Sequence, residues 1–329
     1  MKLKYGIYLG TAILLTTAAQ ATPPESERPA FTILFENDII SNTDRDYTNG
    51  VQLAYTTGPH DALGWVVDTA RFLPFFASTG EVRTSYALGQ NMYTPKDTQL
   101  LNPPLTERPY AGFLYGAIGL MEDNGRRLDQ LQLQLGVIGP LSLAKEAQIW
   151  AHGLVHDPKP QGWATQLRNE PAVELIYERS YKLIPPQSVF GLYVDLEPHI
   201  GGAVGNVYDY ANAGAMMRFG FNLPGGYGPM RIEPGLPGSN FFEPTGGFSA
   251  YVFAGVDGRA LARNIFLDGN TWQTSRSVVK KNLVGDLTIG AAVIFRHVRL
   301  AFTHVYRTKE YSTQTSPDQF GAVSLSFRF

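Results

Sequence analysis

Apolar and polar residues alternate along many stretches of this chain, and this alternation limits its fold more than any other feature. The clearest stretch is residues 128–138, in which Leu131, Leu133 and Leu135 alternate with glutamines. A period of two residues is that of a β-strand with two unlike faces. After the first 21 residues, no segment offers the roughly 18 apolar residues that a membrane helix needs. A closed barrel is the remaining way for such a chain to span a bilayer.

A soluble β-sandwich has the same alternation, so the end of the chain carries more weight. Residues 318–329 place an apolar side chain at every second position from Val323 and end on the aromatic Phe329. This ending resembles the assembly signal of bacterial outer-membrane barrels. We therefore predict an all-β fold, a transmembrane antiparallel β-barrel.

Segments of period two predict about twelve strands, an even number as in single-chain bacterial barrels. They are 31–38, 46–58, 82–92, 108–121, 128–138, 171–181, 187–200, 205–222, 247–261, 282–295, 297–308 and 318–329. With both termini in the periplasm, the connections after odd-numbered strands face outward. Two periplasmic connections, 59–81 and 223–246, are long for such turns, which leaves the count open by one hairpin. No repeat or linker divides the chain.

The first residues have the form of an export signal. Lys2 and Lys4 precede an apolar run that ends at the small residues Ala19-Gln20-Ala21, as in a secretory signal peptide. We predict a signal peptide over residues 1–21 and a single barrel domain over 22–329. The chain has no cysteine and a formal net charge of −2, so it offers neither a disulfide framework nor a basic excess for nucleic acid.

The outward connection 139–170 differs from the others because it predicts helices. Ser142 to His152 has the pattern of a helix capped by Ser142, and a second short helix is expected from Trp163 to Asn169. His152 and His156 are four residues apart, a spacing that suits two zinc ligands, but the zinc-protease motif requires a glutamate where Gly153 stands. As surface residues of a loop, the two histidines would have no chemical role.

Polar residues gather where the first strand turns into the second. Glu36-Asn37-Asp38 ends one strand and Asp46-Tyr47-Thr48 starts the next, and the alternation of the second strand puts Asp46 and Thr48 on the lumen side. Carboxylate and amide oxygens are ligands for a hard cation such as Ca²⁺. His152 belongs to the same outer rim. A cation that polarises a carbonyl and a histidine that activates water would form a hydrolytic site, whereas a solvated acidic loop would have no activity.

Five motifs in order resemble one known family, the LpxR-type outer-membrane lipid A deacylases. The motifs cover residues 36–38, 46–50, 90–95, 107–112, and 135–140 followed by 148–152. The family consists of twelve-stranded barrels that remove the 3′-acyloxyacyl group of lipid A with calcium. The resemblance implies a hydrolase in the bacterial outer membrane, with its site facing outside and lipid A or lipopolysaccharide as substrate. We expect a monomer.

The resemblance also implies roles for individual residues. Asn37, Asp38, Thr48 and His152 match the essential polar residues of the family, and Asp46 matches a further acidic position. Asp38, together with Asn37 and Glu36 beside it, is the candidate calcium site. His152 is the candidate base for a nucleophilic water, a proton transfer to which imidazole is suited near neutral pH. Asn37, Thr48 and Asp46 are further catalytic candidates, whose division of labour stays open.

Three basic residues are candidates for the phosphates of lipid A: Arg108, Lys96 and Arg45. Each is equally a generic contact to lipopolysaccharide. Two other functions remain as alternatives. A serine-hydrolase barrel of phospholipase type requires a serine and a histidine on adjacent lipid-facing positions, and a porin or structural barrel would have an open lumen and dispersed rim carboxylates.

Overall fold

A computed structural model describes residues 28–38, 46–59, 61–72, 80–229, 231–232, 239, 241–243 and 246–329, with the side chains of 46–48, 70 and 155 left out. The predicted signal peptide and Arg45 lie outside these ranges. The strands of the described residues are β1 Ala30–Asn37, β2 Asp46–Thr56, β3 Glu81–Thr94, β4 Ala111–Asp123, β5 Arg127–Ile138, β6 Glu170–Tyr181, β7 Ile184–Val189, β8 Leu192–Gly205, β9 Tyr208–Phe221, β10 Phe248–Asn264, β11 Leu283–Phe295, β12 Val298–Arg307 and β13 Asp318–Arg328.

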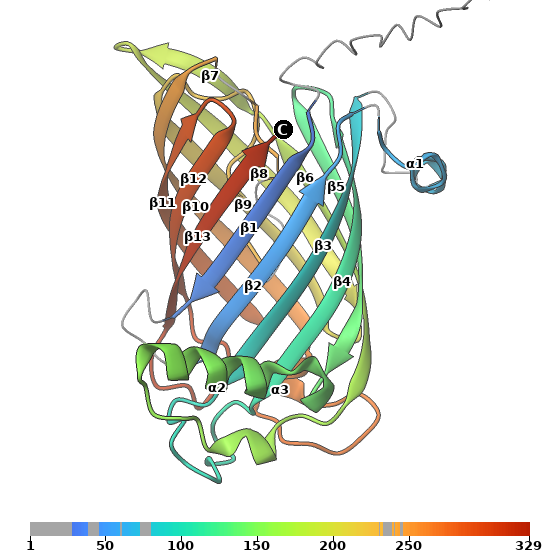
Figure 1. Cartoon of the computed structure of the whole chain (residues 1–329), viewed down its shortest axis with the longest axis vertical. Helices are drawn as coiled ribbons and strands as arrows, with labels where there is room; N and C mark the ends of the chain where they lie inside the picture. Colours follow the sequence, from blue (N-terminus) through green and yellow to red (C-terminus); the bar gives the residue numbers. More distant parts are fainter. Residues whose placement is uncertain are drawn as a thin grey trace, which may run out of the picture.

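The strands form one antiparallel sheet that closes on itself (Figure 1). β1 pairs with β13, so that Ala30 lies opposite Arg328, and β6 pairs with β8 to complete the circle. β7 pairs with β8 beyond this closure. The barrel of the described residues therefore has twelve strands, as predicted, and β7 is an additional strand.

β7 corrects the predicted strand over 187–200, which the structure divides into the end of β7 and the start of β8. Residues 184–189 pair with β8, and the register shifts between Ile184 and Gln187. Proline has no N–H for a ladder, so it is tolerated at such an irregularity on an edge strand. The turn itself falls at Phe190 and Gly191, both of which have positive φ, as a two-residue hairpin turn requires.

The predicted faces of the strands are confirmed. Gln130, Gln132 and Gln134 are buried on the lumen side of β5, whereas Leu135, which follows them, is exposed on the outside. The same division holds in β13, where Ser324 and Ser326 are buried. An apolar outer face and a polar inner face are the pattern of a barrel in lipid. None of the described helices is long and apolar enough to cross a membrane.

The connections divide the barrel into two ends. We call the loop end the one that carries the connections after β1, β3, β5, β8, β10 and β12, with helices α2 (Ala144–Val155) and α3 (Ile265–Asp268). The opposite end, where the C-terminus lies, is the terminal end (Figure 1). The two long connections of the terminal end leave the strand count intact, because one contains a helix and the other folds into the lumen.

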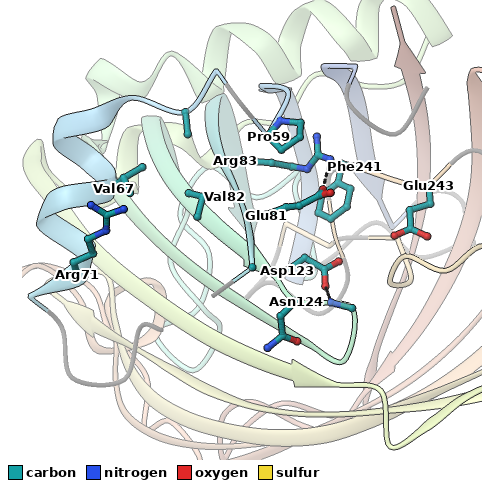
Figure 2. Close-up of a pocket in the computed structure, with 13 residues that line it drawn as sticks. Pro59, Val67, Arg71, Glu81, Val82, Arg83, Asp123, Asn124, Phe241 and Glu243 are labelled. Atoms are coloured by element: carbon teal, nitrogen blue, oxygen red, sulfur yellow. Dashed lines mark hydrogen bonds and ion pairs between the residues drawn. The ribbon is translucent and has the colours of Figure 1, made fainter. Parts of the chain in front are cut away.

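The connection between β2 and β3 carries helix α1 (Gly64–Arg71). Val66 and Val67 of α1 pack against Leu120 on the outer face of β4. A cavity of about 790 Å³ lies beside α1 at the terminal end, lined by Glu81, Arg83 and other residues (Figure 2). This cavity is at the opposite end of the barrel from the polar residues of the predicted site, so it is not part of that site.

We call the connection between β9 and β10 (residues 222–247) the inner connection, and its described residues occupy the lumen. Its described residues Tyr227, Ile232 and Phe242 are buried. Arg231 of the inner connection forms an ion pair with Asp286 of β11, with 3.2 Å between Nη1 and Oδ2. Asp286 also pairs with arginines of β10 and β12, so this buried charge is well compensated.

An aromatic cluster lies in the lumen at the loop end of the barrel. Phe266 of α3 stacks on Tyr93 of β3, with 3.9 Å between the ring centroids, and makes an edge contact with Tyr208 of β9 at 5.6 Å. Tyr93 and Tyr208 also share a hydrogen bond of 3.1 Å between their hydroxyls. Together with the described residues of the inner connection, this cluster obstructs the lumen and leaves a cavity of about 20 Å³ beside Tyr208 and Ile232.

Candidate active site

Helix α2 lies against the outside of the barrel wall at the loop end. Its buried residues Ala144, Gln148 and His152 are spaced by four and form one stripe. Ala144 packs with Met92 of β3 and with Tyr110. In the view of Figure 1, α2 runs below the ends of β2 and β3. The stripe therefore faces the wall. Its side chains are buried between α2 and neighbouring protein, although α2 itself lies on the outer side of the barrel.

The start of α2 is fixed by backbone geometry rather than by the predicted serine cap. Leu143 is the N-cap residue, with φ 59°, and makes no side-chain capping bond. Ser142 belongs to a preceding 3₁₀ turn, Pro140–Ser142, and its hydroxyl donates to the carbonyl of Gly139 at 2.6 Å. The side chain of Gln90 donates to the carbonyl of Ser142, also at 2.6 Å. The prediction that Ser142 caps the helix is wrong because this residue is used one turn earlier.

A second contact holds the middle of α2. The indole N–H of Trp163 donates to Oε1 of Gln148 at 2.7 Å, and both side chains are buried. The predicted second helix is shorter than expected, a 3₁₀ turn over Gly162–Thr165. Because Trp163 also packs on Tyr110, with 4.9 Å between ring centroids, this turn clamps α2 to the strand ends.

His152 lies at the buried end of the stripe, with 6% of its surface exposed. Its Nδ1 is 2.8 Å from the carbonyl oxygen of Pro158. The chain returns to this position because His156 ends the helix in the left-handed conformation, with φ 60°. A carbonyl only accepts, so Nδ1 carries the hydrogen and Nε2 of the neutral ring carries the lone pair. His152 is therefore held in the tautomer that a base acting through Nε2 needs.

Glu36, Asn37 and Asp38 are all buried at the loop end of β1. The alternation of β1 puts Glu36 on the lumen face, together with Leu34. There Oε1 of Glu36 accepts a hydrogen bond of 2.9 Å from the backbone N–H of Ile232. Asn37 follows on the opposite face of the strand and pairs with Asn49 of β2. The three candidate calcium ligands therefore lie in one segment, but Glu36 is directed into the lumen.

The start of β2 contains a β-bulge. Tyr47 pairs with Tyr93 and Asn49 with Met92, which leaves Thr48 as the extra residue. A bulge interrupts the alternation of faces, so the period of β2 does not extend from Gln52 to Thr48 and Asp46. That argument for their lumen-side orientation fails, and their side chains lie outside the described part of the structure. The β1–β2 pairing nevertheless brings their backbone beside residues 36–38.

The structure gives Arg108 a different role from phosphate binding. Its guanidinium is buried, with 1% exposure, and Nη1 donates to Oε2 of Glu310 at 3.1 Å. The guanidinium also lies over the ring of Tyr93, 5.0 Å from its centroid. Arg108 therefore ties two connections of the loop end together. Lys96 is exposed at the same end, and its role in phosphate binding stays a prediction.

The donor chemistry of residues 37–38 fits a hard cation. A buried carboxylate and a neighbouring amide, together with backbone carbonyls where the strand ends, are the oxygen ligands that Ca²⁺ takes. No group of three or more histidine, cysteine or acidic side chains forms a metal cluster among the described residues. A calcium ion here would therefore depend on amide, backbone and water oxygens as well as on Asp38.

Three features of this site were missed by the sequence reasoning. These are the hydrogen bond from Trp163 to Gln148, the Pro158 carbonyl beneath His152, and the contact of Ile232 with Glu36. The spacing of four residues from Ala144 through Gln148 to His152 could have pointed to Gln148. Nothing local pointed to Ile232, which lies 196 residues from its partner.

A closed twelve-stranded barrel with an apolar outer face and a polar, filled lumen is a membrane β-barrel of the outer-membrane type. The described residues of the inner connection, which are buried in the lumen, distinguish it from an open channel. Within that class, the chain belongs to the family described as "Outer membrane protein LpxR", which matches residues 7–329. The resemblance found in the motifs is thereby confirmed.

The solved structure of one family member agrees with this assignment at the level of the fold. LpxR from Salmonella typhimurium is similar with a TM-score of 0.73 and 21% sequence identity, over 91% of this chain and 100% of that chain. The β domain of the Bordetella autotransporter BrkA has a TM-score of 0.44 and 9% identity, over 92% of this chain and 98% of that chain. No curated protein matches the sequence.

Proposed function

We propose that this protein is a calcium-dependent lipid A deacylase that hydrolyses an acyl ester at the outer leaflet of the outer membrane. The observation that carries the proposal is the setting of His152, which is buried on the wall-facing side of α2 and hydrogen-bonds through Nδ1 to the Pro158 carbonyl. α2 lies on the outside of the wall, so a lipid substrate would reach His152 from the leaflet without entering the lumen. The site would then face outside.

In the proposed reaction, Nε2 of His152 takes a proton from water while the water oxygen attacks the ester carbonyl carbon. The bond from this carbon to the sugar oxygen then breaks, and His152 returns the proton to that oxygen. The products are a free fatty acid and a sugar hydroxyl. Asn37 and Thr48 are candidates to orient the water or the carbonyl, and Asp46 is a further candidate.

Asp38 and Asn37 would hold calcium. Bound calcium would supply a positive charge that polarises the ester carbonyl and stabilises the oxyanion. Lys96 remains a candidate for a phosphate of the substrate. Arg108 is not, because its charge is already matched by Glu310 in a buried pair.

The alternatives have less support. His304 is on the lipid-facing side of β12, but its cross-strand neighbours are Ile289 and Gly321 rather than a serine. His199 is buried in the lumen, where Nε2 lies 3.0 Å from Asp257. A pore does not agree with a lumen that the inner connection and the aromatic cluster fill in the described structure.

The decisive test is mass spectrometry of lipid A from cells that produce the protein or its His152→Ala variant. We expect the mass loss of one acyloxyacyl group with the unaltered protein and none with the variant. The folded protein should act on purified lipopolysaccharide with calcium and not with a chelator. Unchanged acylation by correctly inserted protein in the presence of calcium would refute the enzymatic proposal.

A further inference from the structure

The inner connection reaches the candidate site from inside the barrel. Both of its ends are at the terminal end, where it joins β9 and β10. Its residues Arg231 and Ile232 nevertheless contact strands further inside the lumen. Nη1 of Arg231 donates to Thr288 at 2.9 Å, and the N–H of Ile232 donates to Glu36 near the loop end. Arg231 and Ile232, which we call the tip, therefore contact the segment that carries Asn37 and Asp38.

Arginines of the wall fix both legs of the inner connection. Arg218 of β9 donates to the carbonyl of Pro224 on the ascending leg at 3.2 Å. Arg299 of β12 donates to the carbonyl of Ser239 on the descending leg at 2.9 Å, and Arg328 of β13 binds the carbonyl of Phe242. Buried charged donors to backbone carbonyls are strong hydrogen bonds. The position of the tip is thereby set by the wall.

The tip holds β1 by two contacts. The hydrogen bond to Glu36 is one, and the packing of Ile232 with Leu34 and Ala322 is the other. Leu34 and Glu36 are successive lumen-facing residues of β1, so both contacts hold the last residues of the strand before Asn37. β1 ends at Asn37, one residue after Glu36.

We propose that the inner connection is a positioning element of the active site, with Glu36 as the positioning residue through which it acts. Glu36 does not bind calcium in this proposal. Its carboxylate anchors β1 to the Ile232 N–H, and this anchor sets the backbone of Asn37 and Asp38. The inference rests on the proposed function for its catalytic meaning, but the structural link between the tip and residues 37–38 can be tested without activity.

The test removes one N–H. Ile232→Pro deletes the donor, and Ile232→Val keeps it with a similar side chain. In calcium-free protein, we expect the amides at the end of β1 to exchange hydrogen about tenfold faster in the proline variant than in the valine variant, because a partner of the segment is lost. The calcium concentration for half-maximal activity should rise about tenfold or more, as for other supporting contacts of metal ligands.

Arg231→Met is the second variant, for the case in which the proline variant does not insert. It releases the tip, while Asp286 keeps its pairs with Arg259 and Arg307. Unaltered exchange at residues 37–38 in a folded variant of either kind would overturn the proposal. Faster exchange in a protein that never hydrolyses lipid A would support the structural link and refute the proposed function instead.

Glu36→Gln separates positioning from metal binding. The amide keeps an oxygen that accepts the Ile232 N–H but loses the charge that a calcium ion would need. We expect the half-activating calcium concentration to change by about twofold at most, whereas a rise of about tenfold or more would identify Glu36 as a ligand and overturn its assignment.

Discussion

At Gly112 of β4, we expect one added methyl group to lower the activity while the barrel still folds. A Cβ on Gly112 would lie 2.1 Å from Oγ of Ser142 and 2.3 Å from Cβ of Ala144. The serine side chain can rotate away, but Cβ of Ala144 moves only with the backbone of α2. Ordinary contact begins near 3.4 Å, so the start of α2 has to retreat by about 1 Å in Gly112→Ala.

A displacement of this size is costly for catalysis, because an error of about 1 Å in the placement of a reacting group lowers the rate by about 100-fold. We therefore expect kcat of Gly112→Ala to fall by about 100-fold in detergent with purified lipopolysaccharide and calcium. The barrel itself should fold normally, since the added methyl group lies on its outer face and not in the strand ladder.

Gly116→Ala is the matched control. Gly116 is on the same strand and the same face, and a Cβ there meets nothing within 4 Å. It should keep full activity. Heat-modifiable migration in electrophoresis reports the folded barrel of each variant. If Gly112→Ala were folded and as active as Gly116→Ala, the claim that the position of α2 against β4 governs the site would be refuted.

Three further substitutions test other contacts. Trp163→Phe removes the indole N–H and leaves Oε1 of Gln148 buried without this donor, at a cost of about 1–3 kcal/mol; we expect faster hydrogen exchange along α2 and reduced turnover. His156→Gly relieves a left-handed residue by about 1 kcal/mol, so exchange in the last turn of α2 should slow while activity is retained. Arg299→Met removes the donor to the Ser239 carbonyl, and the inner connection should become sensitive to protease in folded protein, with Arg296→Met as the exposed control.

The barrel could be predicted from the sequence because its signal is local. Lumen-facing and lipid-facing residues alternate within each strand, so Gln132 and Leu133 report their faces without knowledge of any partner. The same reasoning does not extend to Thr48, because a bulge breaks the period there. Sequence reasoning also missed the buried ion pair of Arg108, because its partner Glu310 is 202 positions away and no local pattern connects the two residues.

The inner connection shows a different limit. Its glycines and prolines predicted a connection, and none of its described residues lies in a named strand. A segment without periodicity carries no sign of where it runs. Its course is set by arginines at lumen-facing positions of three strands, Arg218, Arg299 and Arg328, which in sequence look like ordinary polar residues of a lumen. The sequence therefore cannot distinguish a long periplasmic turn from a segment that folds into the barrel.

The candidate site depends on elements on both sides of the wall. α2 holds His152 from the outside, through Ala144 and the Trp163 clamp, and the inner connection holds Glu36 from the inside. Because the two supports share no residues, their losses should add rather than mask each other. Gly112→Ala should lower turnover without altering the calcium requirement, whereas Arg231→Met should raise the calcium requirement. A double variant that showed only one of these effects would mean that the two supports act on a single common group.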